Sequence, residues 1–112
     1  MEIKIAEIDG VKVFRPIGNL DRDTAPEFEK LISEQFTPQC HVVIDLSEVE
    51  LVSSAGLRVM FILAKQVDDP SGFVLAGASD YVEDILRVTG FAGLLKVEKT
   101  VAGAVSAIKA SK

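Results

Sequence analysis

The stretch DLSEVELVSSAGLRVM, residues 45–60, decides the fold, because an apolar strand gives way to an apolar helix within it. The run HVVIDL that leads into it, residues 41–46, is β-branched and almost continuously apolar, which is typical of a strand covered on both faces. Farther along, Met60 and Leu63 fall on one face at helical spacing. The pattern predicts a helix over residues 54–68.

The small residues SSAG, 53–56, mark the junction between this strand and this helix. The first N–H groups of a helix have no partner within it, so the hydroxyl of Ser53 or Ser54 can cap them. Gly56 costs about 1 kcal/mol in a helix relative to alanine. Its presence indicates either a close approach by another part of the molecule or tight packing on the sheet. Taken alone, the junction is a helix cap with a tight turn.

The segment before this stretch begins with a predicted hairpin. Ile3 and Ile5, with Ile8 as a further candidate, alternate with charged residues, which is the period of a half-buried strand. The pair DG at 9–10 is a strong turn signal between two such segments. The second strand is therefore predicted to run antiparallel to the first.

The remaining segments alternate between helices and strands. Thr24 followed by Glu27 has the spacing of a capping box, and Ser79 and Gly90 mark the start and the end of a later helix. The order β-β-α-β-α-β-α-β-α predicts a single α/β domain, with a mixed sheet of four to five strands and about four helices that cover at least one face. The predicted strands are 3–8, 11–17, 41–46, 73–77 and 94–98, and the predicted helices are 24–36, 54–68, 79–90 and 100–112.

Composition excludes several classes of function. The net charge of the 112 residues is −5 and no basic stripe is present, which argues against a general nucleic-acid binder. The longest apolar run, 59–64, is far shorter than the ~20 residues of a membrane span, so direct membrane insertion is not expected. Cys40 is the only cysteine, and the absence of an internal disulfide fits the cytoplasm.

Candidate enzyme motifs do not combine into a catalytic site. The only histidine, His41, precedes the strand whose far end leads to Ser54. An extended strand of five residues separates its two ends by about 16 Å, whereas a Ser–His pair needs about 3 Å. No phosphate-binding glycine motif is present. The sequence therefore predicts a protein that is not an enzyme and has no cofactor or metal site.

The central segment HVVIDLSEVELVSSAGLRVMFILAKQV resembles that of STAS domains, specifically the stand-alone bacterial anti-sigma factor antagonists. The segment VKVFRPIGNLDRDTAPEFEKLI resembles the second strand, loop and first helix of the family, and GFVLAGASDYVEDILRVTGFAGLLKVEKTVAGAVSAI resembles its closing part. The resemblance covers nearly the whole chain. It implies one STAS domain over residues 1–112, in the cytoplasm of a bacterium.

The resemblance also implies a partner switch that regulates transcription. In such antagonists, a serine at the start of the second helix is phosphorylated by an anti-sigma factor that is also a serine kinase. The unphosphorylated antagonist binds that kinase and releases its target, phosphorylation blocks binding, and a metal-dependent serine phosphatase reverses it. Aligned on S-x-G-L, the acceptor is Ser54. Ser53 stands where the family commonly has aspartate, and is a second candidate acceptor.

The candidate site residues fall into two sets. The first surrounds the acceptor serine and comprises Asp21, Thr24, Ser53, Ala55 and Gly56. The second is a predicted partner-binding surface; its apolar members could instead be covered by a neighbouring helix. This second set comprises Asp21, Asp23, Ser54, Leu57, Arg58, Phe61, Ile62 and Lys65.

Two alternative functions remain open. The domain could be a non-phosphorylated STAS accessory subunit of a membrane lipid or anion transport system, which the serine at position 53 slightly favours. It could also bind or hydrolyse a nucleotide, although no phosphate loop supports that interpretation.

Overall fold

The computed structural model describes residues 1–110, without the side chain of Ala92. Five strands form one sheet in the order β1-β2-β3-β4-β5. β1 is antiparallel to β2, and the other neighbours are parallel, so the predicted mixed α/β sheet and element order are confirmed. The elements are β1 (Glu2–Ile8), β2 (Val11–Ile17), α1 (Ala25–Ser33), β3 (His41–Asp45), α2 (Ser54–Ala64), η1 (Pro70–Gly72), β4 (Phe73–Ala76), α3 (Asp80–Val88), η2 (Phe91–Gly93), β5 (Lys96–Glu98) and α4 (Val101–Ala110).

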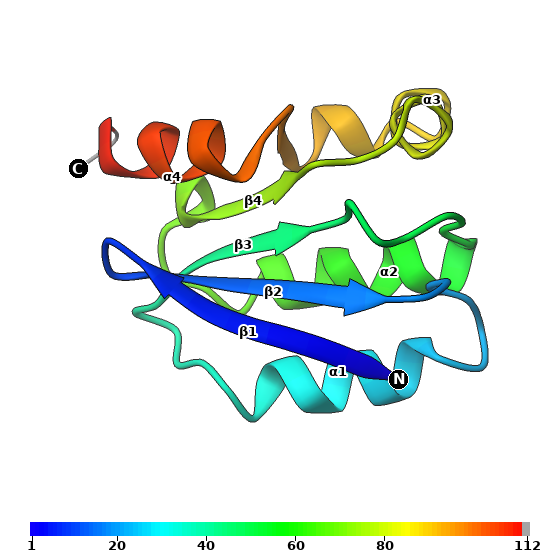
Figure 1. Cartoon of the computed structure of the whole chain (residues 1–112), viewed down its shortest axis with the longest axis horizontal. Helices are drawn as coiled ribbons and strands as arrows, with labels where there is room; N and C mark the ends of the chain where they lie inside the picture. The colour runs from blue at the N-terminus through cyan, green and yellow to red at the C-terminus, as the bar shows by residue number, and fades with distance from the viewer. Residues whose placement is uncertain (111–112) are drawn as a thin grey trace.

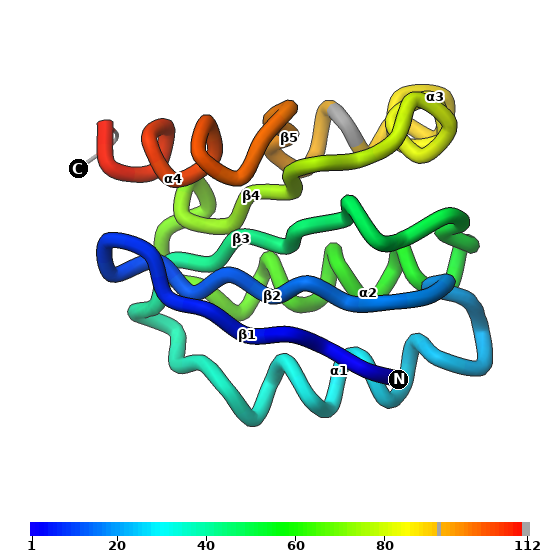
Figure 2. Tube along the Cα trace, in the orientation of Figure 1, coloured from blue at the N-terminus to red at the C-terminus, as the bar shows by residue number. Residues whose placement is uncertain are grey.

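Helices cover both faces of the sheet (Figures 1 and 2). The larger core lies on the side of α1 and α2, where Phe28 and Met60 are fully buried against Phe14 and Ile44 of the sheet. α3 contributes Val82 and Leu86 to this same core. α4 packs on the opposite face, against β3, β4 and β5. Two apolar layers therefore hold the sheet, as expected when parallel strands are buried on both sides.

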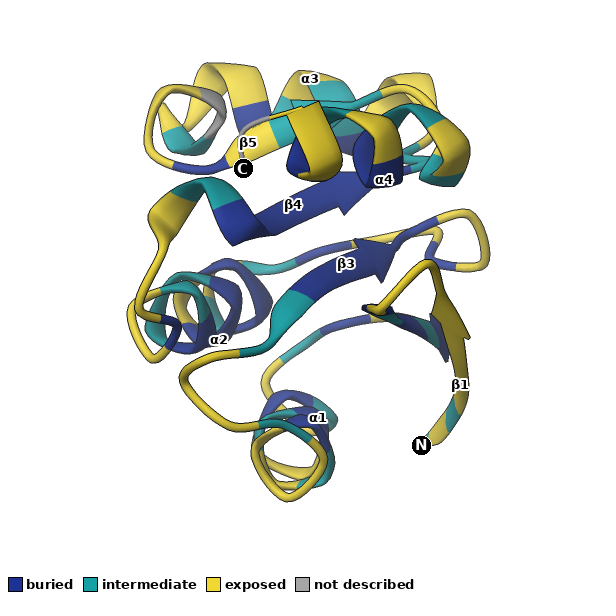
Figure 3. Cartoon of the chain, turned by 90° about the vertical axis from the view of Figure 1, so that its left-hand side faces the viewer, coloured by how far each residue is buried: buried dark blue, intermediate teal, exposed yellow. Residues whose placement is uncertain are grey.

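The hairpin between β1 and β2 forms as predicted, but β1 is more exposed than its pattern indicates. Asp9 and Gly10 both have positive φ, at 51° and 81°, which is the conformation of a tight hairpin turn. Ile3 packs against the larger core, whereas Ile5 and Ile8 are 51% and 42% exposed. The prediction of a half-buried strand is therefore wrong beyond Ile3. As an edge strand, β1 lies outside most of the helical cover (Figure 3).

Two helices end earlier than predicted. α1 ends at Ser33 rather than near 36, because Gln35 N–H donates to Ile32 O and tightens the last turn. α2 ends at Ala64 rather than 68. The turn that follows Ala64 is also tightened by short-range hydrogen bonds. The Asp68 N–H then donates to Pro38 O at 2.8 Å, which holds the chain against the loop that precedes β3. Short-range bonds of this kind commonly close helices.

The last two helices follow the prediction closely. α3 begins after Ser79, whose hydroxyl accepts a hydrogen bond from the Val82 N–H at 3.2 Å, and it ends before Gly90. α4 spans Val101–Ala110, and the predicted extension over 111–112 lies outside the described residues. None of the helices over 1–110 is long and apolar enough to cross a membrane.

Candidate functional site

The loops that follow β2 and β3 lie side by side at one end of the sheet (Figure 1). They meet through backbone hydrogen bonds and through a parallel bridge between Leu20 and Val52. This pairing places the start of α2 directly against the loop that leads into α1. The bonds run from Gly18 N–H to Glu48 O, from Leu20 N–H to Leu51 O and from Ser53 N–H to Leu20 O, at 3.1, 2.9 and 2.8 Å.

Gly56 is required by this contact between the loops. A Cβ atom at position 56 would lie 2.7 Å from the backbone oxygen of Leu20 and 2.9 Å from its Cβ. The Leu20 oxygen also accepts the bond from Ser53, so it cannot move without opening the junction. The close approach that the glycine indicated is confirmed, and the neighbour is the loop after β2.

The two serines of the junction have different environments. Ser53 is the N-cap residue of α2 and accepts a hydrogen bond from the Gly56 N–H at 3.4 Å. Ser54 is the first helical residue and is exposed. Over the described residues, its hydroxyl makes no hydrogen bond to the rest of the protein. Capping is therefore done by Ser53, and the Ser54 hydroxyl is left facing solvent.

Asp21 organises the neighbouring loop through its own turn. One carboxylate oxygen of Asp21 accepts hydrogen bonds from the N–H groups of Asp23 and Thr24, at 2.9 and 3.0 Å. These bonds, with that from Thr24 the largest cause, hold the pKa of Asp21 below its ordinary value. The Thr24 hydroxyl donates to Asn19 O at 2.7 Å. The loop is thus a closed hydrogen-bonded unit with an ionised carboxylate.

The predicted capping box at Thr24 does not form. Thr24 occupies the N-cap position of α1, but its side chain makes no capping hydrogen bond. Its hydroxyl is turned into the preceding loop, where it also accepts a bond from the Asp21 N–H at 3.0 Å. Glu27 instead pairs with the terminal amine of Met1. The contacts of the loop therefore override the local helix signal.

The junction brings the backbone of Asp21 close to the start of α2, but no hydrogen bond between Asp21 and Ser54 is found in the described part of the chain. Asp23 is exposed beside it. The carboxylate of Asp21 is bonded within its own loop, and neither carboxylate contacts the Ser54 hydroxyl over the described residues. The structure therefore brings together the two loops that carry the predicted residues, whereas the Asp21 side chain stabilises its own turn and does not contact Ser54.

A shallow groove between α1 and α2 adjoins Ser54. Its volume is about 300 Å³, and cationic side chains contribute to its wall from both sides. The sequence gives no sign that Arg22 and Glu29 belong here, because only the packing of the two helices brings them to α2. The residues that line the groove are Arg22, Ala25, Pro26, Glu29, Ala55, Arg58, Val59 and Ile62.

Leu57 is buried and does not belong to the predicted partner-binding surface. Its side chain is only 3% exposed and belongs to the larger core, because position 57 falls on the sheet-facing side of α2. Arg58 is exposed, and Ile62 is half-buried in the groove. Fewer of the predicted partner-binding residues are therefore exposed than the sequence indicated.

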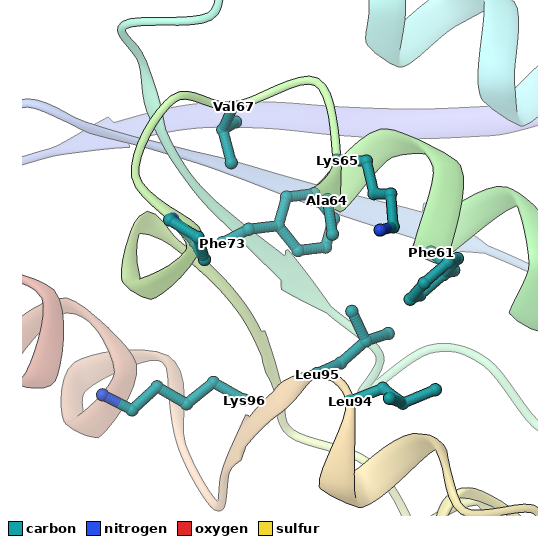
Figure 4. A pocket seen from close by; sticks show the side chains of 9 residues that line it. Phe61, Ala64, Lys65, Val67, Phe73, Leu94, Leu95 and Lys96 are labelled. Atoms are coloured by element: carbon teal, nitrogen blue, oxygen red, sulfur yellow. The ribbon is translucent and has the colours of Figure 1, made fainter.

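Phe61 and Lys65 face a second hollow, at the other end of α2 (Figure 4). The Lys65 ammonium lies 4.9 Å from the centre of the Phe61 ring. That ring meets Phe91 edge-on at 6.1 Å, a contact that the sequence pattern did not indicate. Leu94 borders this hollow and is 63% exposed. These contacts orient Phe61 toward η2, so it is partly a packing residue.

Metal-binding side chains do not cluster in the described part of the chain. No group of three or more His, Cys, Asp or Glu residues that could hold a metal ion is found within residues 1–110. On the loop beside the start of α2, the carboxylate of Asp21 accepts hydrogen bonds within its own turn, and Asp23 is exposed.

Comparison with known proteins shows the family of the chain. Residues 2–104 match the model of the STAS domain family. BtrV of Bordetella bronchiseptica, provisionally described as an anti-sigma factor antagonist, is 29% identical over 111 residues, which cover 97% of this chain and 96% of BtrV. The crystal structure of an anti-sigma factor antagonist from Mycobacterium paratuberculosis is similar with a TM-score of 0.87 at 26% identity, over 96% of this chain and 93% of that one. SpoIIAA in its unphosphorylated form shares the fold, with a TM-score of 0.67 at 13% identity over 96% and 98% of the two chains.

Proposed function

The chain belongs to the STAS domain family as an anti-sigma factor antagonist-like member, and from this premise we propose that it is a protein-interaction switch controlled at Ser54. The unphosphorylated form binds an anti-sigma factor that is also a serine kinase and thereby releases the target of that kinase. Phosphorylation at Ser54 blocks the binding. The observation that carries this proposal is the exposed Ser54 hydroxyl, which makes no hydrogen bond over the described residues.

The arrangement of the two serines suits phosphoryl transfer to Ser54. Because Ser53 supplies the cap, modification of Ser54 does not remove the hydrogen bond that starts the helix. In the reaction, the Ser54 oxygen bonds to the γ-phosphorus of ATP while the bond to the β-phosphate breaks and ADP leaves. The hydroxyl proton passes to a base of the kinase. A metal-dependent serine phosphatase would restore the hydroxyl by transferring the phosphoryl group to water.

The phosphate would act locally, without unfolding the domain. A phosphoserine carries about −1.5 to −2 charges at pH 7, and the free N–H groups and dipole at a helix start favour negative charge. The same charge would be added beside the loop that carries Asp21 and Asp23, which is joined to the start of α2 through the backbone of Leu20. Acidic groups of a docked partner would be repelled, and the added bulk would occupy the contact surface.

The surface that we assign to the kinase surrounds this serine. It comprises Ser54 and Arg58, the loop residues Asp21 and Asp23, and the half-buried Ile62 in the groove between the helices. Phe61 and Lys65 extend it toward the far end of α2. This mixture of charged and apolar groups is suited to a transient protein interface.

The decisive experiment is phosphosite mapping after incubation of the full chain with ATP and its cognate anti-sigma factor kinase. We expect phosphate on Ser54, and we expect Ser54→Ala to abolish the label whereas Ser53→Ala retains most of it. Phosphate on neither serine would contradict the proposal and favour the accessory subunit of a transport system.

A further inference from the structure

Arg58 lies one helical turn beyond Ser54, on the same exposed side of α2. Side chains four residues apart on a helix are neighbours. Because each Cα–Cβ bond tilts toward the N-terminus of the helix, the side chain of Arg58 leans back toward the turn that carries Ser54. An acidic group four residues before a basic one is also the favourable order for such a pair.

Arg58 has no acidic partner in the described part of the unphosphorylated chain. The ion pairs found there join Met1 to Glu27, Arg87 to Asp84 and Lys109 to Asp9. Glu29 lines the same groove as Arg58, yet these two side chains are not among the ion pairs. The guanidinium group of Arg58 is therefore available to an anion that appears beside it.

We propose that Arg58 binds the phosphate on Ser54, so that phosphorylation removes a cation from the docking surface as well as adding a dianion. This inference rests on the proposed assignment of Ser54 as the modified residue. Guanidinium groups bind phosphate through paired N–H donors with suitable geometry. The N–H groups at the start of α2 face the same phosphate from the helix end.

The ion pair would change what a kinase finds at this surface. In the unphosphorylated chain, Arg58 is free to pair with a carboxylate of the kinase. After modification, the phosphate competes for the guanidinium group and repels that carboxylate. One covalent event at Ser54 thus reverses the charge that α2 presents, without a change of fold.

The test is a phosphorus NMR titration of the full chain phosphorylated at Ser54, with the modified residue introduced during translation so that no kinase is needed. The second pKa of a phosphoserine lies near ~6, and a neighbouring cation lowers it by stabilising the dianion. We expect Arg58→Gln to raise this pKa by about 0.3 unit relative to the parent chain, which is the size of an i, i+4 pair. Added salt should shrink the difference.

Lys65→Gln is the matched control, because Lys65, the residue that caps the C-terminus of α2, is also an exposed cation but lies about 16 Å from Ser54 along the helix axis. It should leave the phosphate pKa unchanged, and Arg22→Gln, on the other side of the groove, should change it less than Arg58→Gln does. Equal pKa values in the parent and Arg58→Gln chains, or a larger change in either other variant, would overturn the inference. Because no kinase takes part, a failure here is distinct from a failure of Ser54 to be phosphorylated.

Discussion

Ser53 and Ser54 are chemically identical neighbours whose roles are separated by the backbone. Ser53 has extended backbone angles, with φ −87° and ψ 175°, and its hydroxyl turns back to the Gly56 N–H. Ser54 is already helical and exposed, and its hydroxyl makes no hydrogen bond over the described residues. The sequence alone predicted a capping hydroxyl and a modified hydroxyl at this junction. Only the backbone conformation in the structure shows that Ser53 is the residue that caps the helix.

Gly56→Ala should destabilise the domain, although alanine is the better helix former. The added Cβ would lie 2.7 Å from the Leu20 backbone oxygen. Overpacking of this kind costs about 1–3 kcal/mol, which outweighs a gain in helix propensity of about 1 kcal/mol. Urea unfolding measures the difference. Gly93→Ala is the control, because a Cβ there meets no atom within 4 Å; equal stability of the two variants would show that the junction is not tightly packed.

Asp21→Asn should destabilise the domain in a pH-dependent way. Hydrogen bonds from the loop hold the pKa of Asp21 below its ordinary value of 3.8, so the ionised carboxylate contributes stability above about pH 4. This contribution disappears as the pH falls through the lower pKa of the folded chain. We therefore expect the loss in unfolding free energy to be constant near neutral pH and to shrink in acid.

Urea unfolding of the Asp21→Asn chain at several pH values tests this expectation. Asp23→Asn is the matched control, because the carboxylate of Asp23 accepts no hydrogen bond within the described residues. A deficit for Asp21→Asn that stays the same down to about pH 2.5 would mean that the charge of Asp21 does not support the loop.

At the scale of elements, the sequence predicted the order and type of every strand and α-helix, but not the short 3-10 helices η1 and η2, nor how far each element is covered. The apolar runs of β3 and β4 are fully buried, as their continuity indicated. In β1, Ile3 and Ile5 have the same alternating pattern, yet only Ile3 packs against the core. The pattern identifies which residues share a face of the strand. Whether a helix reaches that face depends on tertiary packing.

Ile5→Ala should therefore cost far less than a buried isoleucine does. Ile5 is 51% exposed, whereas Ile32 of α1 is fully buried. We expect a loss of about 1 kcal/mol or less for Ile5→Ala and of about 2–5 kcal/mol for Ile32→Ala. Thermal or urea unfolding distinguishes them. A similar loss for the two variants would mean that β1 is covered in solution.

Ser53→Asp should stabilise α2. Aspartate caps a helix at least as well as serine, and its charge suits the helix start. The present cap is long, at 3.4 Å, which leaves room for a stronger acceptor. We expect a gain of about 0.3–1 kcal/mol in the free energy of unfolding. A loss of stability would indicate that the carboxylates of the neighbouring loop repel the added charge.

Across the whole molecule, the proposed switch lies on a scaffold that does not need to move. The junction of the two loops is fixed by three backbone hydrogen bonds, and α2 is anchored through Leu57, Met60 and Leu63 in the larger core. Ser54 and Arg58 project from the outer side of the same helix. A phosphate can therefore change the surface while the core stays as it is.

The most direct test of Ser54 as the switch is the affinity of the chain for its cognate anti-sigma factor kinase, measured by calorimetry with and without phosphate on Ser54. We predict at least about a tenfold loss of affinity on phosphorylation, which corresponds to about 1.4 kcal/mol, with an unchanged thermal unfolding midpoint. Ser54→Ala should bind like the unmodified chain. Equal affinities of the phosphorylated and unmodified chains would contradict the assignment of Ser54 as the switch.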